Sequence, residues 1–241
     1  MNWKNDGMKY LFVSTSSLAA AFVKVHFAEQ EMPDTVGTIK SNDGCMIAQF
    51  YSINEQIILC QVDSNSMSID EVNQIGTKII EVCPKNCAIA ILASESIVNY
   101  HQEKSSEEDS FILRKVQNGH WKSTSKVCCP MLEQPNVIGG ISAAILTISE
   151  LQGLPCILIV QYSSSNLIDS QNMEGYNIIK ENVKSFCKPV LNQEIQKRYK
   201  NLASRAPSNF LYTWTVIVKG AKYELTHSYR LSILYFHVLN K

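Results

Sequence analysis

Four thiols occupy two short stretches of the sequence, and thiolates are ligands that zinc favours. Cys83 and Cys87 flank a Pro-Lys-Asn tripeptide, and Cys128 adjoins Cys129. Structural zinc sites favour matched pairs of ligands with gaps of about two to four residues, and this spacing does not supply them. The cysteines also adjoin apolar runs, where a reduced thiol packs as a small hydrophobe. We therefore predict core positions for these cysteines and no metal site.

A thiol can also act as a catalytic nucleophile when a base lies beside it. For Cys128 or Cys129, His120 is the histidine nearest in the sequence. This single neighbour is weak support for catalysis, and we predict no catalytic residue among the cysteines.

Polar side chains follow these cysteines between two prolines. Glu133, Gln134 and Asn136 could be interpreted as a catalytic cluster. However, Pro130 and Pro135 restrict the backbone dihedral φ, and neighbouring polar side chains can then bond backbone groups that a rigid turn leaves unpaired. We favour this structural role, in which the three side chains order a loop.

Two expected helix N-termini are possible places for an anion or another ligand. Ser14-Thr15-Ser16-Ser17 lies where a strand meets a helix, and Gly139-Gly140 precedes a second helix. Such positions bind phosphate in open α/β folds. Hydroxyls there are also ordinary helix caps, and glycine supplies positive φ wherever a turn requires it. We favour the capping and loop interpretations.

The sequence carries none of the common local motifs of catalysis or nucleotide binding. It lacks a Gly-x-Ser-x-Gly elbow, a His-Glu-x-x-His helix, a Walker loop and a Gly-x-Gly-x-x-Gly fingerprint. We predict no catalytic, cofactor-binding or metal-binding residues and no cofactor. An enzyme or a small-molecule binder on an α/β scaffold stays as the alternative, because many active sites have no local motif.

The charge balance argues against nucleic acid and anionic lipid as partners, since 22 basic residues match 22 acidic ones. The eight cysteines of this 241-residue chain indicate a reducing compartment. The segment from Leu11 to Val25 is broken by hydroxyl residues and does not suit a signal peptide. No apolar run is long enough for membrane insertion. We expect a cytoplasmic location, with the nucleus or the surface of the endoplasmic reticulum as further options.

Strands and helices are expected to alternate along the chain. The Ser68/Glu71 capping-box pattern and the apolar stripe from Ile141 to Leu151 each predict a helix. Together the patterns predict one three-layer α/β domain with a mixed, mostly parallel sheet flanked by helices and one β-hairpin. The expected strands are 10–14, 45–51, 56–62, 88–92 and 156–162, and the expected helices are 18–27, 69–80, 141–151, 173–186 and 191–202.

The string Val127-Cys-Cys-Pro-Met-Leu-Glu-Gln-Pro-Asn136 resembles the signature region of the proteasome assembly chaperone 1 family. Further matching pieces fall in the family's order over roughly the first two hundred residues. They are Lys9 to Val25, Ile58 to Gln61, Cys83 to Asn86, Ala88 to Leu92, Val137-Ile138, Ile141 to Leu151 and Leu154 to Tyr162.

This resemblance implies a phosphorylase-like α/β fold and a chaperone that is not an enzyme. It implies a heterodimer with proteasome assembly chaperone 2, which promotes formation of the ring of proteasome α subunits and prevents wrong ring association. It also implies a C-terminal hydrophobic-Tyr-x motif that inserts between ring subunits, with the terminal carboxylate meeting a lysine.

Leu211-Tyr212-Thr213 matches that motif and is the predicted partner-binding site. We divide the chain into a leader (1–8), an α/β chaperone domain (9–203), a tail with the motif (204–213) and an extension (214–241). The motif is internal, because the chain continues to Lys241. The extension is interpreted as an alternative transcript or read-through, or else as an additional hairpin whose turn lies at residues 219–222.

Overall fold

The computed structural model describes residues 9–28, 33–41, 43–63, 67–101, 111–121, 129–164, 172–179, 197–198, 212–218 and 221–227. The chain divides into two units, Met1–Leu202 and Ala203–Lys241. Within the described residues, no helix combines the length and the apolar character that crossing a bilayer needs.

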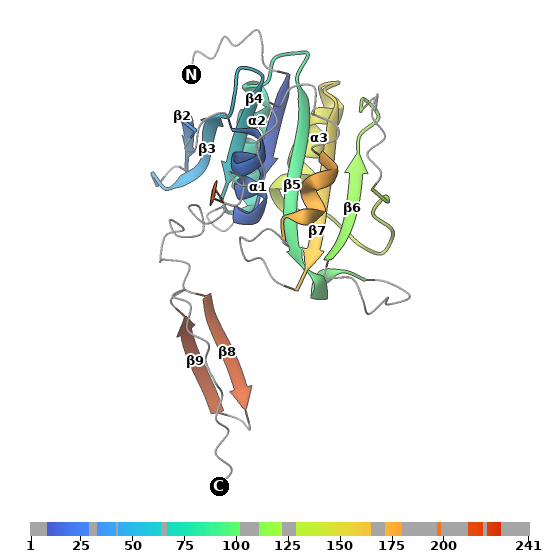
Figure 1. The fold of residues 1–241 in the computed structure, drawn as a ribbon. Coiled ribbons are helices and arrows are strands. Elements are labelled where there is room, and N and C mark those ends of the chain that lie inside the picture. The colour runs from blue at the N-terminus through green and yellow to red at the C-terminus, as the bar shows by residue number, and fades with distance from the viewer. Residues whose placement is uncertain are drawn as a thin grey trace. The chain divides into compact units, whose positions relative to one another are not determined.

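Within the described residues, the first unit contains the seven strands of one sheet, the α-helices α1, α2 and α3, and the short 3₁₀ helices η2 and η3 (Figure 1). Its elements are β1 (Tyr10–Ser14), α1 (Ser17–Phe27), β2 (Thr35–Lys40), β3 (Met46–Ser52), β4 (Ile57–Val62), α2 (Ile69–Glu81), β5 (Ala88–Ser96), η2 (Ile97–Asn99), β6 (Phe111–Gln117), α3 (Gly140–Leu151), β7 (Cys156–Ser163) and η3 (Glu174–Tyr176).

The sheet is mixed, as the sequence predicts, with the order β2-β3-β4-β1-β5-β7-β6. Its centre, β4-β1-β5-β7, is parallel. The pairs β2-β3, β3-β4 and β6-β7 are antiparallel and lie toward the two edges. The predicted parallel pairing therefore holds at the centre of the sheet. The predicted β-hairpin is the antiparallel pair β3-β4.

Helices cover both faces of the sheet, which makes the domain three-layered. Along β1, Leu11 and Val13 contribute to one buried cluster and Phe12 to the other, as the alternation of side chains in a strand requires. The first cluster includes Ile79 of α2 and residues of α3, whereas the second includes Phe22 of α1. The predicted three-layer α/β domain is therefore confirmed.

Local chemistry explains where α1 and α2 begin. The Ser16 hydroxyl accepts the backbone N–H of Ala19 at 3.2 Å, which satisfies one of the free donors of the first turn. At α2, the Glu71 carboxylate accepts the backbone N–H of Ser68 at 3.0 Å and its hydroxyl at 2.8 Å. The predicted N-cap of α1 and the predicted capping box of α2 are both confirmed.

The structure differs from the predicted elements at three places. Strands β2 and β6 were not expected, because both are edge strands without a continuous apolar run. Within the expected helix 173–186, the described part begins as the 3₁₀ helix η3 and is helical at 177–179. The rest of that helix, most of 191–202, the leader 1–8 and the polar segment 103–109 lie outside the described residues.

The second unit contains an antiparallel pair of strands, β8 (Tyr212–Val218) and β9 (Ala221–His227). Val218 pairs with Ala221 at one end and Tyr212 with His227 at the other. This pairing agrees with the hairpin alternative for the extension. The first strand of the pair begins before residue 214, at Tyr212 within the predicted tail motif.

Candidate functional site

The hydroxyl groups at the carboxyl ends of β1 and β5 bond one another. The Ser16 hydroxyl donates to Ser94 Oγ at 3.0 Å, and Ser94 Oγ lies 2.8 Å from the hydroxyl of Tyr176. That tyrosine hydroxyl also donates to the carbonyl of Ala93 at 2.6 Å. Burial raises the pKa of Tyr176, so its side chain is a neutral phenol at neutral pH.

This cluster occupies the position at which open α/β folds often hold a ligand. The structure brings the predicted Ser16 together with Tyr176, a fully buried residue that the sequence patterns did not indicate. The capping role of Ser16 is confirmed, and the surrounding hydroxyls take part in internal hydrogen bonds.

We call residues Cys129 to Gly139 the signature segment. Glu133 is its central contact, because Arg114 of β6 donates to both carboxylate oxygens, from Nε at 2.7 Å and from Nη2 at 3.1 Å. Tyr100, which follows η2, donates its hydroxyl to Glu133 Oε1. The Tyr100 ring also packs against Tyr162 of β7, with ring centroids 4.9 Å apart. Three separate parts of the chain are joined at this carboxylate.

Electrostatics agree with this arrangement. The hydrogen bonds from Arg114 lower the pKa of Glu133 to about 2. Desolvation, with a contribution from the bond to Glu133, raises the pKa of Tyr100 to about 12. The pKa of Arg114 is raised mainly by its bonds to the carboxylate. At neutral pH the cluster therefore holds a charged pair and a neutral phenol, and none of the three groups is poised to exchange a proton.

Asn136 fixes the other end of the signature segment. Its Oδ1 accepts the backbone N–H of His101 at 2.8 Å, and its Nδ2 donates to the His101 carbonyl at 2.9 Å and to the Glu133 carbonyl at 3.0 Å. The predicted loop-ordering role is confirmed for Asn136. Glu133 also orders the loop, although it binds the side chains of Arg114 and Tyr100 where we expected backbone groups.

The signature segment also covers the open edge of the sheet. The backbone N–H of Lys115 in β6 donates to the Pro130 carbonyl at 2.9 Å, and the N–H of Leu132 donates to the Lys115 carbonyl at 2.8 Å. Met131 thereby forms a parallel bridge with Lys115. Pairing along an edge strand removes a template for unwanted association, so the segment protects β6.

Large apolar side chains are exposed on the segments that these bonds hold. Val98 of η2 is 79% exposed, Val137 is 85% exposed and Met131 is 51% exposed. They belong to a short group of exposed large hydrophobic residues within the described ranges.

Of the four cysteines, the three that the structure describes do not meet as a zinc site. Cys83 and Cys87 pack with the cluster on the α2 and α3 side of the sheet, whereas Cys129 packs with the cluster on the α1 side. Desolvation raises the pKa of Cys129 to about 11, so its thiol is neutral. Among the residues that the structure describes, no group of His, Cys, Asp and Glu could hold a metal ion. Cys128 lies outside those residues.

The glycine pair before α3 serves the local backbone. Gly140 has φ of +59° and begins α3, and Gly139 is the residue before its first turn. A left-handed backbone angle favours glycine at this position, as the loop interpretation requires.

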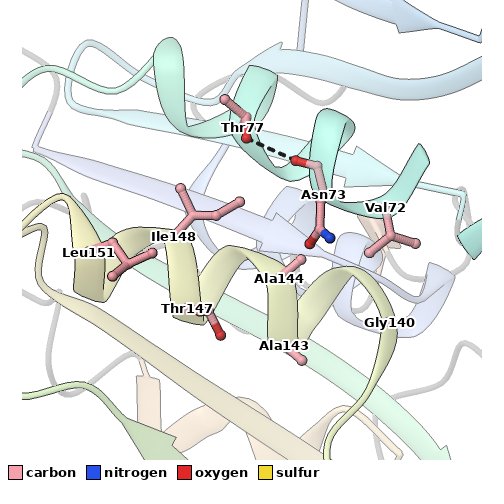
Figure 2. Close-up of a pocket in the computed structure, with 9 residues that line it drawn as sticks. All are labelled: Val72, Asn73, Thr77, Gly140, Ala143, Ala144, Thr147, Ile148 and Leu151. Carbon is pink, nitrogen blue, oxygen red and sulfur yellow. Dashed lines mark hydrogen bonds between the residues drawn. The ribbon is translucent and has the colours of Figure 1, made fainter. Parts of the chain in front are cut away.

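A shallow groove of about 530 Å³ lies between α2 and α3 (Figure 2). The helices approach closely below it, because a Cβ atom at Gly76 would lie 3.1 Å from Ile148 Cδ1 and 3.5 Å from Ala144 Cβ. All of the residues that line the groove are uncharged. They are Val72, Asn73, Thr77, Gly140, Ala143, Ala144, Thr147, Ile148 and Leu151.

The structure describes two of the three residues of the predicted tail motif. Tyr212 and Thr213 are the first residues of β8, where they pair with His227 and Thr226. Leu211 lies outside the described residues. The role of the motif in partner binding therefore stays a prediction.

The sequence and fold agree with one known family. A family model described as Proteasome assembly chaperone 4 matches residues 8–212. The chain belongs to the proteasome assembly chaperone family. This result confirms the resemblance of the signature string. In the structure, residues 129–136 of that string brace a loop and cover an edge strand.

Relatives of this family carry a consistent name. Proteasome assembly chaperone 1 of Homo sapiens is 31% identical over 134 residues, which cover 54% of this chain and 46% of the human protein. Proteasome assembly chaperone 1 of Nematostella vectensis is 21% identical over 183 residues, covering 69% and 70% of the two chains. The matched stretch spans about half the length of the mammalian relatives.

Solved structures show the same fold. A Thermoplasma acidophilum protein of unknown function has a TM-score of 0.59 at 12% identity, covering 85% of this chain and 88% of its own. Pyrococcus furiosus PbaA, described as an archaeal homologue of proteasome-assembly chaperone, has a TM-score of 0.57 at 14% identity, with coverages of 83% and 90%. At these identities the likeness establishes the fold.

Proposed function

We propose that this chain is a non-enzymatic chaperone for assembly of the proteasome core particle. It acts as a heterodimer with proteasome assembly chaperone 2, promotes formation of the α ring and prevents wrong association of α rings. The observation that carries the proposal is the family match over residues 8–212, together with relatives named proteasome assembly chaperone 1.

The chemistry of the signature segment supports a binding role. Its Glu133 pairs with Arg114 of β6 and so braces the loop. Val98 of η2 and Val137 of the segment are exposed. A rigid loop presenting apolar side chains loses little conformational entropy when it binds a partner. The proposal therefore places partner contacts on the body of the protein as well as on its tail.

The tail motif is the second part of the proposal. Leu211 and Tyr212 fill an apolar pocket between α subunits, and a chain that ends at Thr213 adds a terminal carboxylate facing a lysine. Removing one partner of such a buried charged contact costs about 2 to 5 kcal/mol. The full chain lacks that carboxylate at Thr213, because residues 214–241 follow it.

The tail is tested by comparing the full chain with a version truncated after Thr213. Binding to purified α rings is measured by biolayer interferometry, with Tyr212→Ala in the truncated chain as the control. We expect truncation to strengthen binding at least tenfold and Tyr212→Ala to remove the gain. Equal binding of all three proteins would refute the role of the motif.

The alternative is a small-molecule binder on the same scaffold. It would use the helix N-termini near Ser14 to Ser17, where the Tyr176 hydroxyl and its partners lie, or near Gly139-Gly140. Thermal-shift measurements with nucleosides and inorganic phosphate test it, since a ligand that binds the native state raises the midpoint of unfolding in a saturable manner.

A further inference from the structure

The predicted tail motif continues directly into a strand. Strand β8 reads Tyr-Thr-Trp-Thr-Val-Ile-Val, and every residue in it is aromatic or β-branched. Such residues favour an extended, pleated backbone, and no glycine or proline interrupts them. Tyr212 and Thr213 are therefore strand residues by the chemistry of the segment as well as by their place in the structure.

Strand β9 pairs with β8 along its whole length (Figure 1). His227 lies opposite Tyr212, and Thr226 lies opposite Thr213. In an antiparallel pair, alternate facing residues exchange backbone N–H and C=O bonds across the two strands. One edge of the motif's backbone is therefore occupied by a segment of the same chain.

Insertion into a pocket between α subunits requires the motif as a single extended segment. Paired strands lie only about 5 Å apart, so a pocket that fits one segment would clash with the second. Strand β9 must therefore separate from the motif before the motif can enter. The apparent affinity for the pocket is then reduced in proportion to the fraction of molecules whose hairpin is open.

We propose that β9 is an autoinhibitory strand, which pairs with the tail motif and keeps it from the pocket between α subunits. An α ring competes with β9 for the same residues, Tyr212 and Thr213. This inhibition rests on the proposed role of the motif in ring binding. It adds a second cause of weak binding by the full chain, separate from the absence of a terminal carboxylate at Thr213.

The inhibition should be partial and reversible. A two-stranded pair is only marginally stable by itself. Tyr212 and His227 also pair at the end remote from the connection between Val218 and Ala221, and the ends of elements fray first. If about a tenth to a third of the molecules have an open hairpin, complete opening strengthens ring binding about three- to tenfold.

Prolines in β9 open the hairpin without touching the motif. Successive residues of a paired strand point their N–H groups alternately toward and away from the partner, so Glu224→Pro with Leu225→Pro removes at least one ladder donor. This variant keeps all 241 residues and adds no carboxylate at Thr213. Ser232→Pro with Ile233→Pro, placed after β9, is the matched control.

Binding of these proteins to purified α rings is measured by biolayer interferometry. We expect the proline pair within β9 to strengthen binding about three- to tenfold and the control pair to leave it unchanged. All four substitutions lie in the second unit, so thermal unfolding of the first unit should match the wild type.

A disulfide provides the opposite perturbation, because it locks the hairpin closed. Thr215 and Glu224 are register partners, and facing Cα atoms lie about 4.5–5.5 Å apart, within the reach of a disulfide. Thr215→Cys with Glu224→Cys is made in a Cys45→Ser background, because Cys45 is exposed. Diamide takes up two hydrogen atoms as the two thiols form one disulfide, and it is removed before binding is measured. We expect the oxidised protein to bind α rings more weakly than the same protein reduced, and the Cys45→Ser parent to show no difference.

The outcomes separate the inhibition from the role of the motif. If the chain truncated after Thr213 binds more tightly than the full chain, while the prolines in β9 and the disulfide change nothing, the inhibition is refuted and the motif keeps its role. If truncation gives no gain and Tyr212→Ala in the truncated chain has no effect, the role of the motif is refuted, and the inhibition is refuted with it.

Discussion

The contact between Arg114 and Glu133 should contribute measurably to stability, and Glu133→Gln tests this. Two hydrogen bonds of 2.7 and 3.1 Å join the guanidinium to the carboxylate. The Glu133 side chain is 41% exposed and that of Arg114 is 17% exposed, so solvent screens the pair. We therefore expect a loss of about 1 kcal/mol at neutral pH, well below the cost of breaking a fully buried pair. For a domain of this size, that loss lowers Tm by about 2–4 °C.

The effect should depend on pH in a defined direction. The folded-state pKa of Glu133 is about 2, below its ordinary value of 4.5. A lowered pKa means that the contribution is fully present above the unfolded-state value and is lost as the pH falls toward about 2. Urea denaturation of the wild type and Glu133→Gln across this range measures the difference in the free energy of unfolding.

The difference between these two proteins should narrow progressively below about pH 4.5, because the unfolded wild type then takes up a proton at Glu133 while the folded protein keeps the carboxylate charged down to about pH 2. Glu81→Gln, at an exposed position on α2, is the matched control and should change the free energy of unfolding at neutral pH by less than Glu133→Gln does. A difference that stays constant from neutral pH down to about pH 2, or an equal loss in the Glu81 variant, would refute the reasoning.

Two further substitutions test the packing at the strand ends. Tyr176→Phe removes the hydroxyl that donates to the Ala93 carbonyl at 2.6 Å and should cost about 1–3 kcal/mol in urea denaturation, because a buried acceptor loses its partner. An unchanged free energy of unfolding would contradict this arrangement. Gly175→Ala places a Cβ atom 2.9 Å from Cδ of the buried Gln161 and should lower stability by about 1–3 kcal/mol through overpacking. A Tm equal to or above that of the wild type would show that this site has room.

Helix starts were predictable from the sequence because their chemistry is local. The serine at the start of α1 and the Ser68/Glu71 pair at α2 act within three residues of the backbone groups that they satisfy. The central strands were predictable for a related reason, since a strand covered on both faces requires a continuous apolar run. In β7 all eight residues are buried.

Edge strands and long-range contacts could not be derived in this way. Every residue of β6 is half-buried, so its sequence, with Arg114 and Lys115 at its centre, lacks both the apolar run and a clean alternation. Tyr100, Arg114 and Glu133 meet only because η2, β6 and the signature segment come together in space. Nothing in their sequence spacing encodes that meeting, and the family resemblance drew attention to Glu133 without naming its partners.

The central claim, that this chain acts in assembly of the proteasome core particle, is tested most directly by co-purification. The affinity-tagged full chain is expressed together with proteasome assembly chaperone 2 and the α subunits, and the recovered complexes are weighed by native mass spectrometry. We predict a heterodimer with chaperone 2 and a larger species that contains both chaperones and α subunits. Recovery of the tagged chain without chaperone 2 and without α subunits would contradict the account.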